Sequence, residues 1–448
     1  MDIQVDKLRK ALDLVSPAVA RGKVTLPITT SVLFSGGKLL ATNLEMWISV
    51  DLPELGRSSF LLPHRAITEA LKFTSGRQTL TMTPDRTKVV LTTPSSRLSL
   101  VKPGMPRDFP PMPHPESDGF AVDGDKLVGS LRQVHPYISS EKARPVLTGV
   151  ALKLGEELEV AAADGFQLAI DRPGIPLSGG ETGHLAVVPG NAVKVLGTLW
   201  RKGDKPPDID AARIAGQATN AGPEHRRRGG STQIGHLAVA RRNIRLIEDG
   251  SNISFSFGTI TMCSGLLQGD FPNYQSLIPD TEGGRRVMVN GEELLRALNQ
   301  VANIADQGSS IARLNWSGAE LVISARASEV GEAEVTINAV VEGGEAEIAF
   351  NIRHLQGYLK GKTDVVTIAT PPGDADELKS KPSVFTHRGG PMVIMMPMFV
   401  TAPTEQSPAD TEPAAAEGSE TEGQPAEPNE GTAPRARRRR RSTVEDED

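Results

Sequence analysis

The sequence predicts an α+β fold built from three like domains, each with two helices and antiparallel sheets. Three kinds of segment occur three times in the same order along the 448 residues. The first is an amphipathic helix, expected at residues 5–20, 123–139 and 290–305. The second is a pair of strands around a glycine turn (29–53, 147–173 and 310–339), and the third is a strand leading into a second helix (58–76, 183–203 and 346–362). Such self-similarity indicates a repeated structural unit.

Each of the first helices carries its apolar residues at spacings of three and four, which places them on one face. The expected buried faces are Leu8, Ala11, Leu12 and Val15; Leu127, Leu131 and Val134; and Leu294, Leu295, Leu298 and Val301. Polar residues near a helix start can satisfy its free amides, so Asp6, Asp125 and Asn290 are candidate N-caps. Alternation of apolar and polar residues elsewhere predicts about eight strands per domain.

The expected domain boundaries follow the repeat and two shifts in composition. The first domain spans residues 1–115, the second 116–280 and the third 281–401. Residues 203–236 combine paired Pro, scattered Gly and an arginine run, which is typical of a solvated loop inserted into the second domain. Residues 402–448 are rich in Pro, Glu and Ala and then in Arg, with few large apolar side chains, so a disordered tail is expected there.

Composition and charge narrow the class of protein. Aromatic residues make up only 4%, which disfavours a surface that binds single strands by stacking on bases. The single cysteine, Cys263, excludes an intramolecular disulfide and is expected to be a small core residue. The net charge is −6 and the tail accounts for it, so the rest of the chain is balanced. We expect a soluble, cytoplasmic protein because no apolar segment is long enough to cross a membrane.

Motifs for catalysis and metal binding are absent from the sequence. It contains no P-loop, no GxSxG, no HExxH and no paired cysteine ligands. His225 and His236 fall in the inserted loop, and His387 has no partner at metal-ligand or triad spacing. We therefore expect neither an enzyme nor a cofactor or metal. The rival reading, a nuclease, would show as metal-dependent DNA cleavage.

Several short motifs in a fixed order resemble those of the bacterial DNA polymerase III beta subunits, the sliding clamps. The resemblance covers residues 1 to about 400. Its motifs are TLPI (25–28), ATNLEM (41–46), RPVLTG (144–149), ADGFQLA (163–169), GDFPNY (269–274) and VIMMPM (393–398). Each is weak alone, but their order on a threefold repeat makes them specific.

The resemblance implies a non-enzymatic ring that encircles duplex DNA and tethers the replicative polymerase, conferring processivity. Two chains would meet head to tail as a homodimer, with the first domain of one against the third domain of the other and helices lining the hole. Double-stranded DNA, the polymerase III catalytic subunit, the clamp loader and other proteins with a clamp-binding motif would be its partners. The DNA-facing residues would be Lys10, Lys23, Lys126, Arg132, Lys142, Lys194, Arg296, Arg353 and Lys360. Ordinary solvated helix faces are the alternative for each of them taken singly.

The resemblance also implies an apolar pocket between the second and third domains that takes a short partner peptide. By position it would involve Leu147, Phe166, Leu168, Pro272, Leu277, Met396, Pro397 and Met398, although core packing at a domain junction is the alternative. The chain departs from the family at Phe166-Gln167, where a His-Arg pair is usual, at Ser276, where a basic residue is common, and at Phe399-Val400. A more apolar pocket is therefore expected.

Two further expectations concern the dimer seam and the tail. The seam would involve Phe109, Ile304 and Ala305, and the small Ala305 puts the strength of the seam in question. Family chains typically stop near residue 400, so the arginine-rich run 435–441 either contacts DNA or an acidic partner, or belongs to a tail that only adds solubility. An accessory or mobile-element clamp that serves repair or other partners is the alternative function.

Overall fold

The computed structural model describes residues 1–113, 119–177, 184–203 and 243–399. Nearly all of the expected inserted loop and the whole expected tail lie outside these residues. Elements β1–β8 belong to a first repeat, β9–β16 to a second and β17–β25 to a third. The strand content agrees with the sequence prediction, whereas the short helix α8 was not expected.

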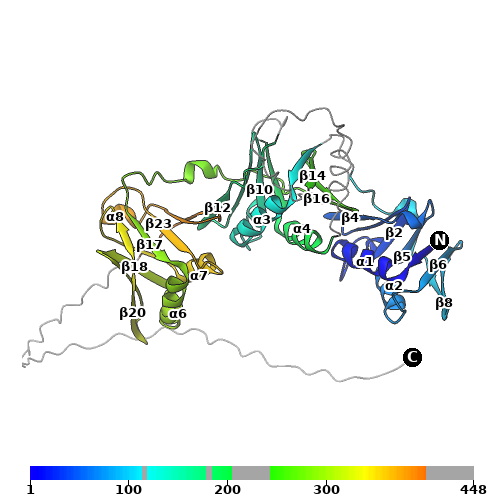
Figure 1. Ribbon diagram of the computed structural model, residues 1–448, viewed down its shortest axis with the longest axis horizontal. Coiled ribbons are helices and arrows are strands. Elements are labelled where there is room, and N and C mark those ends of the chain that lie inside the picture. Colours follow the sequence, from blue (N-terminus) through cyan, green and yellow to red (C-terminus); the bar gives the residue numbers. More distant parts are fainter. Residues whose placement is uncertain (114–118, 178–183, 204–242, 400–448) are drawn as a thin grey trace, which may run out of the picture. The chain divides into compact units, whose positions relative to one another are not determined.

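The first repeat alternates strands and helices from the N-terminus (Figure 1). Its elements are β1 (Asp2–Gln4), α1 (Val5–Val15), η1 (Ser16–Ala18), η2 (Pro27–Thr30), β2 (Ser31–Ser35), β3 (Lys38–Thr42), β4 (Met46–Asp51), η3 (Pro53–Leu55), β5 (Ser59–Pro63), α2 (His64–Leu71), β6 (Thr79–Pro84), β7 (Lys88–Thr93), β8 (Ser96–Val101) and η4 (Pro106–Asp108).

The second repeat follows the same order. Its elements are β9 (Phe120–Asp123), α3 (Gly124–Val134), η5 (His135–Tyr137), η6 (Pro145–Thr148), β10 (Gly149–Leu154), β11 (Leu158–Ala163), β12 (Gln167–Asp171), β13 (His184–Pro189), α4 (Gly190–Lys202), β14 (Asn243–Glu248), β15 (Asn252–Phe257), β16 (Ile260–Gly265) and η7 (Tyr274–Leu277).

The third repeat adds a short strand and a short helix. Its elements are β17 (Arg286–Asn290), α6 (Gly291–Gln307), β18 (Ile311–Ser317), β19 (Glu320–Ala327), β20 (Gly331–Asn338), β21 (Val340–Glu342), β22 (Ala346–Asn351), α7 (Ile352–Leu359), β23 (Val365–Ala369), α8 (Ala375–Leu378), β24 (Ser383–His387) and β25 (Met392–Met395).

Each principal helix begins directly after a strand, and capping explains where several of them begin. The Asn290 side chain accepts hydrogen bonds from the amides of Glu292 and Glu293 at the start of α6. The start of α3 is capped by Asp123 rather than by the expected Asp125, because a cap must precede the first helical residues whose amides it accepts. The expected cap Asp6 is also wrong, since α1 begins at Val5, one residue before it.

The predicted apolar faces of the first helices form the core of each repeat. Leu8, Ala11, Leu12 and Val15 are buried in α1, Leu127, Leu131 and Val134 in α3, and Leu294, Leu298 and Val301 in α6. Leu295 is only half-buried and packs at the edge of this core. Cys263 is fully buried in β16, as expected for a small core residue.

Sheets continue from one repeat into the next. Strand β4 pairs with β16, so the first and second repeats share the sheet β5-β2-β3-β4-β16-β15-β14-β9. Strand β12 pairs with β25, so the second and third share β13-β10-β11-β12-β25-β24-β23-β17-β21. Two four-stranded sheets remain, β1-β6-β7-β8 in the first repeat and β20-β19-β18-β22 in the third. Strands β8 and β20 are their outer edges.

The three domain bounds predicted from the sequence stay predictions. The boundary after residue 115 falls among residues that the structure does not describe. The boundary after residue 280 falls in the loop between η7 and β17. Residues 1–400 form one compact unit.

Candidate functional site

An apolar groove with a volume of about 610 Å³ lies where β12 of the second repeat meets β25 of the third. Six of the eight residues predicted for a peptide pocket line it: Leu147, Phe166, Leu168, Pro272, Leu277 and Met396. Three of their side chains are unusually exposed for large apolar groups, at 59% for Phe166, 51% for Leu277 and 43% for Met396. Exposed apolar groups that gather in one concave surface indicate a binding site.

The other two predicted pocket residues do not line the groove. Pro397 is buried and Met398 is half-buried, with its N–H donating to the carbonyl of Ala349 at 2.7 Å. The Met396 N–H donates to the Phe166 carbonyl at 3.0 Å and so continues the pairing of β25 with β12. Because neighbouring residues of an extended chain point to opposite faces, Met396 faces the groove and Pro397 faces away from it.

A tight turn between β11 and β12 presents Phe166 to the groove. The Asp164 carboxylate accepts hydrogen bonds from the amides of Phe166 at 2.8 Å and Gln167 at 2.7 Å. Gly165 adopts φ +100°, a conformation that side chains with a Cβ rarely adopt. The Gln167 side-chain amide also donates to Asp164, so its polar group is satisfied within the turn.

The groove lining is largely uncharged, as the sequence departures predicted. Gln167 and Ser276 are neutral, and Arg144 at the rim is the charged residue of the lining within the described part of the chain. His354 on α7 lies beside Phe166, with 6.2 Å between the ring centroids. Burial lowers the pKa of His354 from its ordinary value, so its ring is neutral near neutral pH.

The floor of the groove contains residues that the pocket prediction omitted, above all Phe271, Tyr274, Ile278 and Ile394. Tyr274 is 4% exposed, and its hydroxyl donates to Glu159 Oε1 at 2.7 Å. The sequence carried a signal for it, since Tyr274 ends the GDFPNY motif (269–274) that supports the resemblance.

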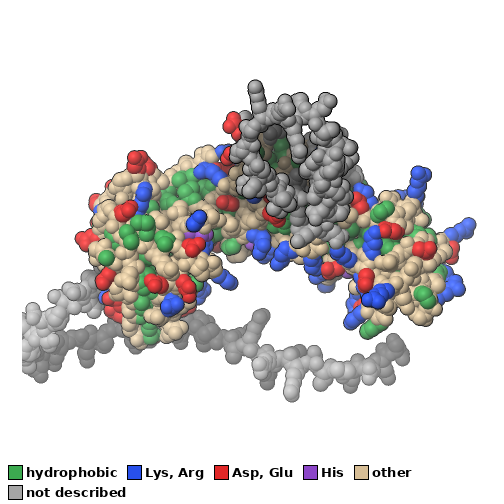
Figure 2. All heavy atoms as spheres, viewed as in Figure 1, with side chains coloured by type: hydrophobic (Ala, Val, Ile, Leu, Met, Phe, Trp, Pro, Cys, Tyr) green, Lys and Arg blue, Asp and Glu red, His purple; other side chains and the backbone are tan. Residues whose placement is uncertain are grey.

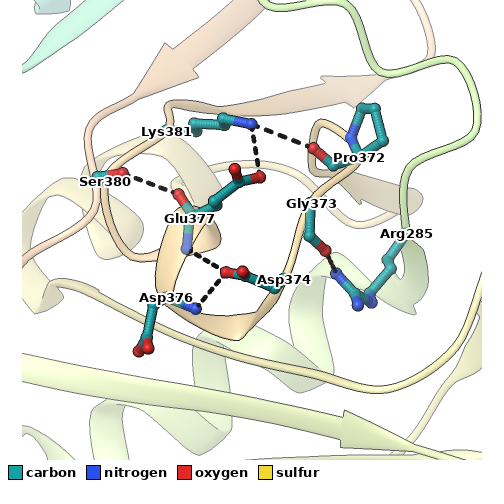
Figure 3. Close-up of polar contacts among 8 residues, drawn as sticks. All are labelled: Arg285, Pro372, Gly373, Asp374, Asp376, Glu377, Ser380 and Lys381. Atoms are coloured by element: carbon teal, nitrogen blue, oxygen red, sulfur yellow. Dashed lines mark hydrogen bonds and ion pairs between the residues drawn. The ribbon is translucent and has the colours of Figure 1, made fainter.

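The rim that carries Pro382 is shaped by a polar loop in the third repeat (Figure 3). Asp374 caps the short helix α8 by accepting from the amides of Asp376 and Glu377. Lys381, next to Pro382, donates to the Glu377 carboxylate at 2.9 Å and to the Pro372 carbonyl at 3.3 Å.

The same loop is tied to the strand that leads into the third repeat. Arg285, directly before β17, donates through its guanidinium to the Gly373 carbonyl at 2.9 Å. Its backbone also pairs with Thr370, whose N–H donates to the Arg285 carbonyl at 2.9 Å. These contacts fix the chain before α8, and the Lys381 contacts fix the chain after it, so the rim is held by the fold of the third repeat.

All nine residues predicted to face DNA are exposed. Lys10 lies on α1, Lys126 and Arg132 on α3, Lys194 on α4, Arg296 on α6 and Arg353 on α7, while Lys360 follows α7 and Lys23 and Lys142 lie in loops. Figure 2 shows Lys and Arg side chains gathered along the margin where Figure 1 labels α3, α4 and α1.

The charge on these helices is uneven between repeats. In the third repeat Arg296 lies 3.4 Å from Glu292, and Arg353 lies 3.3 Å from Asp306, so each basic group has an acidic neighbour. In the second repeat Arg132 and Lys194 line a hollow of about 360 Å³ between α3 and α4. Arg201 joins them there; the sequence prediction missed it, although it lies two helical turns after Lys194 on the same face.

The three predicted seam residues have different surroundings. Phe109 and Ala305 are 5% and 1% exposed within the single chain, and Ile304 is half-buried. A side chain buried in its own chain has little surface left for a partner subunit. Ile304 therefore stays a seam candidate, whereas the structure does not present Phe109 or Ala305 at a surface.

The exposed edge strands β8 and β20 have opposite charge. All of β8 except the half-buried Leu100 is exposed, and Arg97 lies on it with Lys88 on the neighbouring β7. Strand β20 exposes Glu332 and Glu334. An unpaired edge of exposed backbone groups is a template for another strand.

No helix among the described residues is long and apolar enough to cross a membrane. Within the same residues, no cluster of His, Cys, Asp and Glu is arranged to hold a metal ion. His387 lies near the Tyr358 hydroxyl instead, and His225 and His236 fall outside the described residues.

Comparisons with known proteins agree with the fold. Residues 275–366 match the family model described as the C-terminal domain of the DNA polymerase III beta subunit. The beta sliding clamp of Synechococcus elongatus is 26% identical over 368 residues, which cover 79% of this chain and 88% of that protein. The chain is thus similar to DNA polymerase III beta subunits along most of its length. The predicted resemblance is thereby confirmed.

Solved structures of beta subunits share the fold along most of the chain. The DNA polymerase III beta subunit of Pseudomonas aeruginosa superimposes with a TM-score of 0.72 at 22% identity, covering 89% of this chain and 100% of that one. The sliding clamp of Bacillus subtilis superimposes with a TM-score of 0.71 at 20% identity, covering 89% and 99%. The predicted class, repeated clamp domains with helices and antiparallel sheets, is confirmed.

Proposed function

We propose that this protein forms a closed ring around duplex DNA and holds the replicative DNA polymerase on it, without catalysing a reaction itself. The observation that carries the proposal is the way sheets are shared. Each junction between repeats joins strands of two repeats into one sheet, and the chain ends with one open four-stranded sheet at each terminal repeat. Pairing β8 of one copy with β20 of a second copy would form the same kind of joint between subunits.

Head-to-tail pairing follows from the charges of these two edges. Two β8 edges would bring the Arg97 side chains of both copies together. Two β20 edges would bring the Glu334 side chains together, whereas Glu332 is paired with Arg326 at 3.0 Å. Pairing β8 with β20 places opposite charges across the joint instead. Like charges in contact are costly, so electrostatics selects the heterologous arrangement. Two such joints close a ring of two chains.

A closed ring explains how the protein stays on DNA without gripping it. Release requires either opening of the ring or a free DNA end, so retention depends on topology. The exposed basic residues of the helices attract phosphates loosely, and such contacts carry no sequence information. A polymerase tethered to the ring stays at high effective concentration near the primer end.

We further propose that the groove between β12 and β25 docks a short apolar segment of the polymerase, of the clamp loader and of other partners. Its exposed Phe166, Leu277 and Met396 offer the apolar contacts, and flexible Met side chains suit related but unequal peptides. The neutral Gln167 and Ser276 favour apolar over acidic side chains along most of the groove. We place this protein in the cytoplasm, with the replicating DNA.

An accessory clamp that serves repair or other partners is the second candidate function. The observation that favours it is the groove chemistry, which departs from the usual basic residues at Gln167 and Ser276. Affinity capture with the purified protein separates the two candidates. Recovery of the replicative polymerase and the clamp loader supports the main clamp, and their absence supports the accessory role.

Mass in solution tests the ring itself. Light scattering at micromolar concentration is expected to give twice the chain mass of 47.8 kDa. A monomer at every concentration would remove the proposal, because an open single chain has no closed path around DNA.

A further inference from the structure

A buried polar contact joins the floor of the groove to the middle of the second repeat's sheet. Tyr274 lines the groove, and its ring meets Phe271 edge to face with 6.0 Å between centroids. Its hydroxyl donates to Glu159 Oε1 at 2.7 Å. Glu159 lies on β11, is 7% exposed and does not line the groove.

A second partner completes the environment of the Glu159 carboxylate. Arg172, directly after β12, donates to Glu159 Oε2 at 2.6 Å, while its own side chain is more than half exposed. Burial alone would raise the pKa of Glu159, but the hydrogen bonds from Tyr274 and Arg172 and the positive charges of Arg172 and Lys153 together lower it. The carboxylate is therefore ionised at neutral pH and is a strong acceptor for the phenol.

The contact is important because of where Tyr274 lies in the chain. Tyr274 is the first residue of η7, the short helix that carries Ser276 and Leu277 into the groove. Among the residues that the structure describes, the Tyr274–Glu159 bond is the hydrogen bond that ties residues 268–283 to an element outside that segment. Apolar packing supplies the remaining contacts, and packing is less directional than a hydrogen bond.

We propose that Glu159 is a positioning residue for partner docking: braced by Arg172, it fixes the Tyr274 hydroxyl and so sets the groove wall formed by η7. The inference rests on the proposed partner groove and deepens it. Glu159 acts on the bound peptide through Tyr274 alone. Removing either end of the hydrogen bond leaves η7 free to shift. Peptide binding must then hold η7 in place, and the free energy that this ordering requires lowers the affinity for the peptide.

The test measures the affinity of the full chain for a fluorescent peptide that copies the clamp-binding segment of the organism's replicative polymerase. Tyr274→Phe and Glu159→Gln are each expected to weaken binding about tenfold, the loss of one charge-assisted hydrogen bond. The double variant is expected to bind as Tyr274→Phe does, because Glu159 has no other route to the peptide. Glu157→Gln, the same change on an exposed neighbour, is the matched control.

A purely structural role would give a different pattern. The thermal midpoint and the dimer mass, measured on the same samples, are expected to stay near the wild-type values, with Arg172→Gln as a milder variant in case Glu159→Gln folds poorly. Unchanged affinity in both single variants, or additive losses in the double variant, would overturn the inference. Failure of the wild-type chain to bind the peptide would instead remove the partner groove itself.

Discussion

Leu44 occupies in the first repeat the place that Gly165 occupies in the second. Each follows a residue whose side-chain oxygen accepts the two amides beyond the turn: Asn43 from Glu45 and Met46, and Asp164 from Phe166 and Gln167. Both have positive φ, at 76° for Leu44 and 100° for Gly165. The internal repeat of the chain therefore includes these two hydrogen-bonded turns, each next to a strand that joins two repeats. In the first turn the left-handed position is a leucine instead of a glycine.

The turn at Gly165 predicts a measurable cost of adding a Cβ. Gly165→Ala is expected to lower the free energy of unfolding by about 1 kcal/mol, because alanine disfavours positive φ. The cost is conformational, since the nearest atom to the added Cβ, on Arg144, is 3.5 Å away. Denaturant titration measures it, with Gly155→Ala as a control at a glycine without positive φ. Equal losses in the two variants would contradict the backbone explanation.

Much of the fold was predictable because the sequence repeats its periodicities. Apolar positions three and four apart fixed the helix faces at Leu8, Leu127 and Leu294, and these residues are buried as expected. The caps were less predictable. Asp123 and Asp125 are both acidic and two residues apart, so composition alone does not decide which one accepts the helix amides, and the other instead accepts the indole N–H of Trp200.

Only those groove residues that lie in or next to the sequence motifs could be predicted. Phe166 and Leu277 came from the resemblance, whereas His354 lies on a helix distant in sequence and meets Phe166 only in three dimensions. Pro397 does not line the groove, because the direction of a side chain past the end of β25 depends on the register with β12. The burial of Phe109 and Ala305 likewise could not be predicted from the motifs, because it depends on how the side chains pack within the folded chain.

The uneven charge of the helices predicts unequal contributions to DNA binding. Arg132→Gln and Lys194→Gln are each expected to reduce the slope of log affinity against log salt by about 0.9, the value for one phosphate contact. Arg296→Gln and Arg353→Gln are expected to change it less, because Glu292 and Asp306 already neutralise those side chains. Titrations on a short duplex at several salt concentrations measure the slope. Equal slopes for all four variants would contradict this assignment.

Opposite charges on the two edge strands predict a charge-dependent dimer. Arg97→Glu makes both β8 and β20 acidic and is expected to raise the dimer dissociation constant about tenfold. Glu334→Lys in the same chain is expected to recover part of the loss, since the two edges then differ in sign again. Arg57→Glu, an exposed site away from β8, controls for the charge change. Sedimentation at several concentrations measures dissociation, and equal weakening by the Arg57 variant would contradict the edge assignment.

Three half-buried histidines predict the response to acid. Burial lowers the folded-state pKa of His64, His135 and His354 below the ordinary value of about 6.5. The unfolded chain therefore binds more protons than the folded chain below that pH, so the free energy of unfolding falls as the pH falls through this range. Denaturant titrations from neutral to mildly acidic pH measure the decline, and His135→Gln is expected to make it shallower. Stability that rises on acidification would contradict the prediction.

Retention on DNA with and without free ends tests the central claim most directly. The protein is loaded by the clamp loader onto covalently closed circular DNA, excess protein is removed, and half of the sample is cut once with a restriction enzyme. The account predicts long retention on the closed circle and loss within the time needed to slide to an end on the cut molecule. Equal retention on both would show that the protein grips DNA, and would contradict the ring.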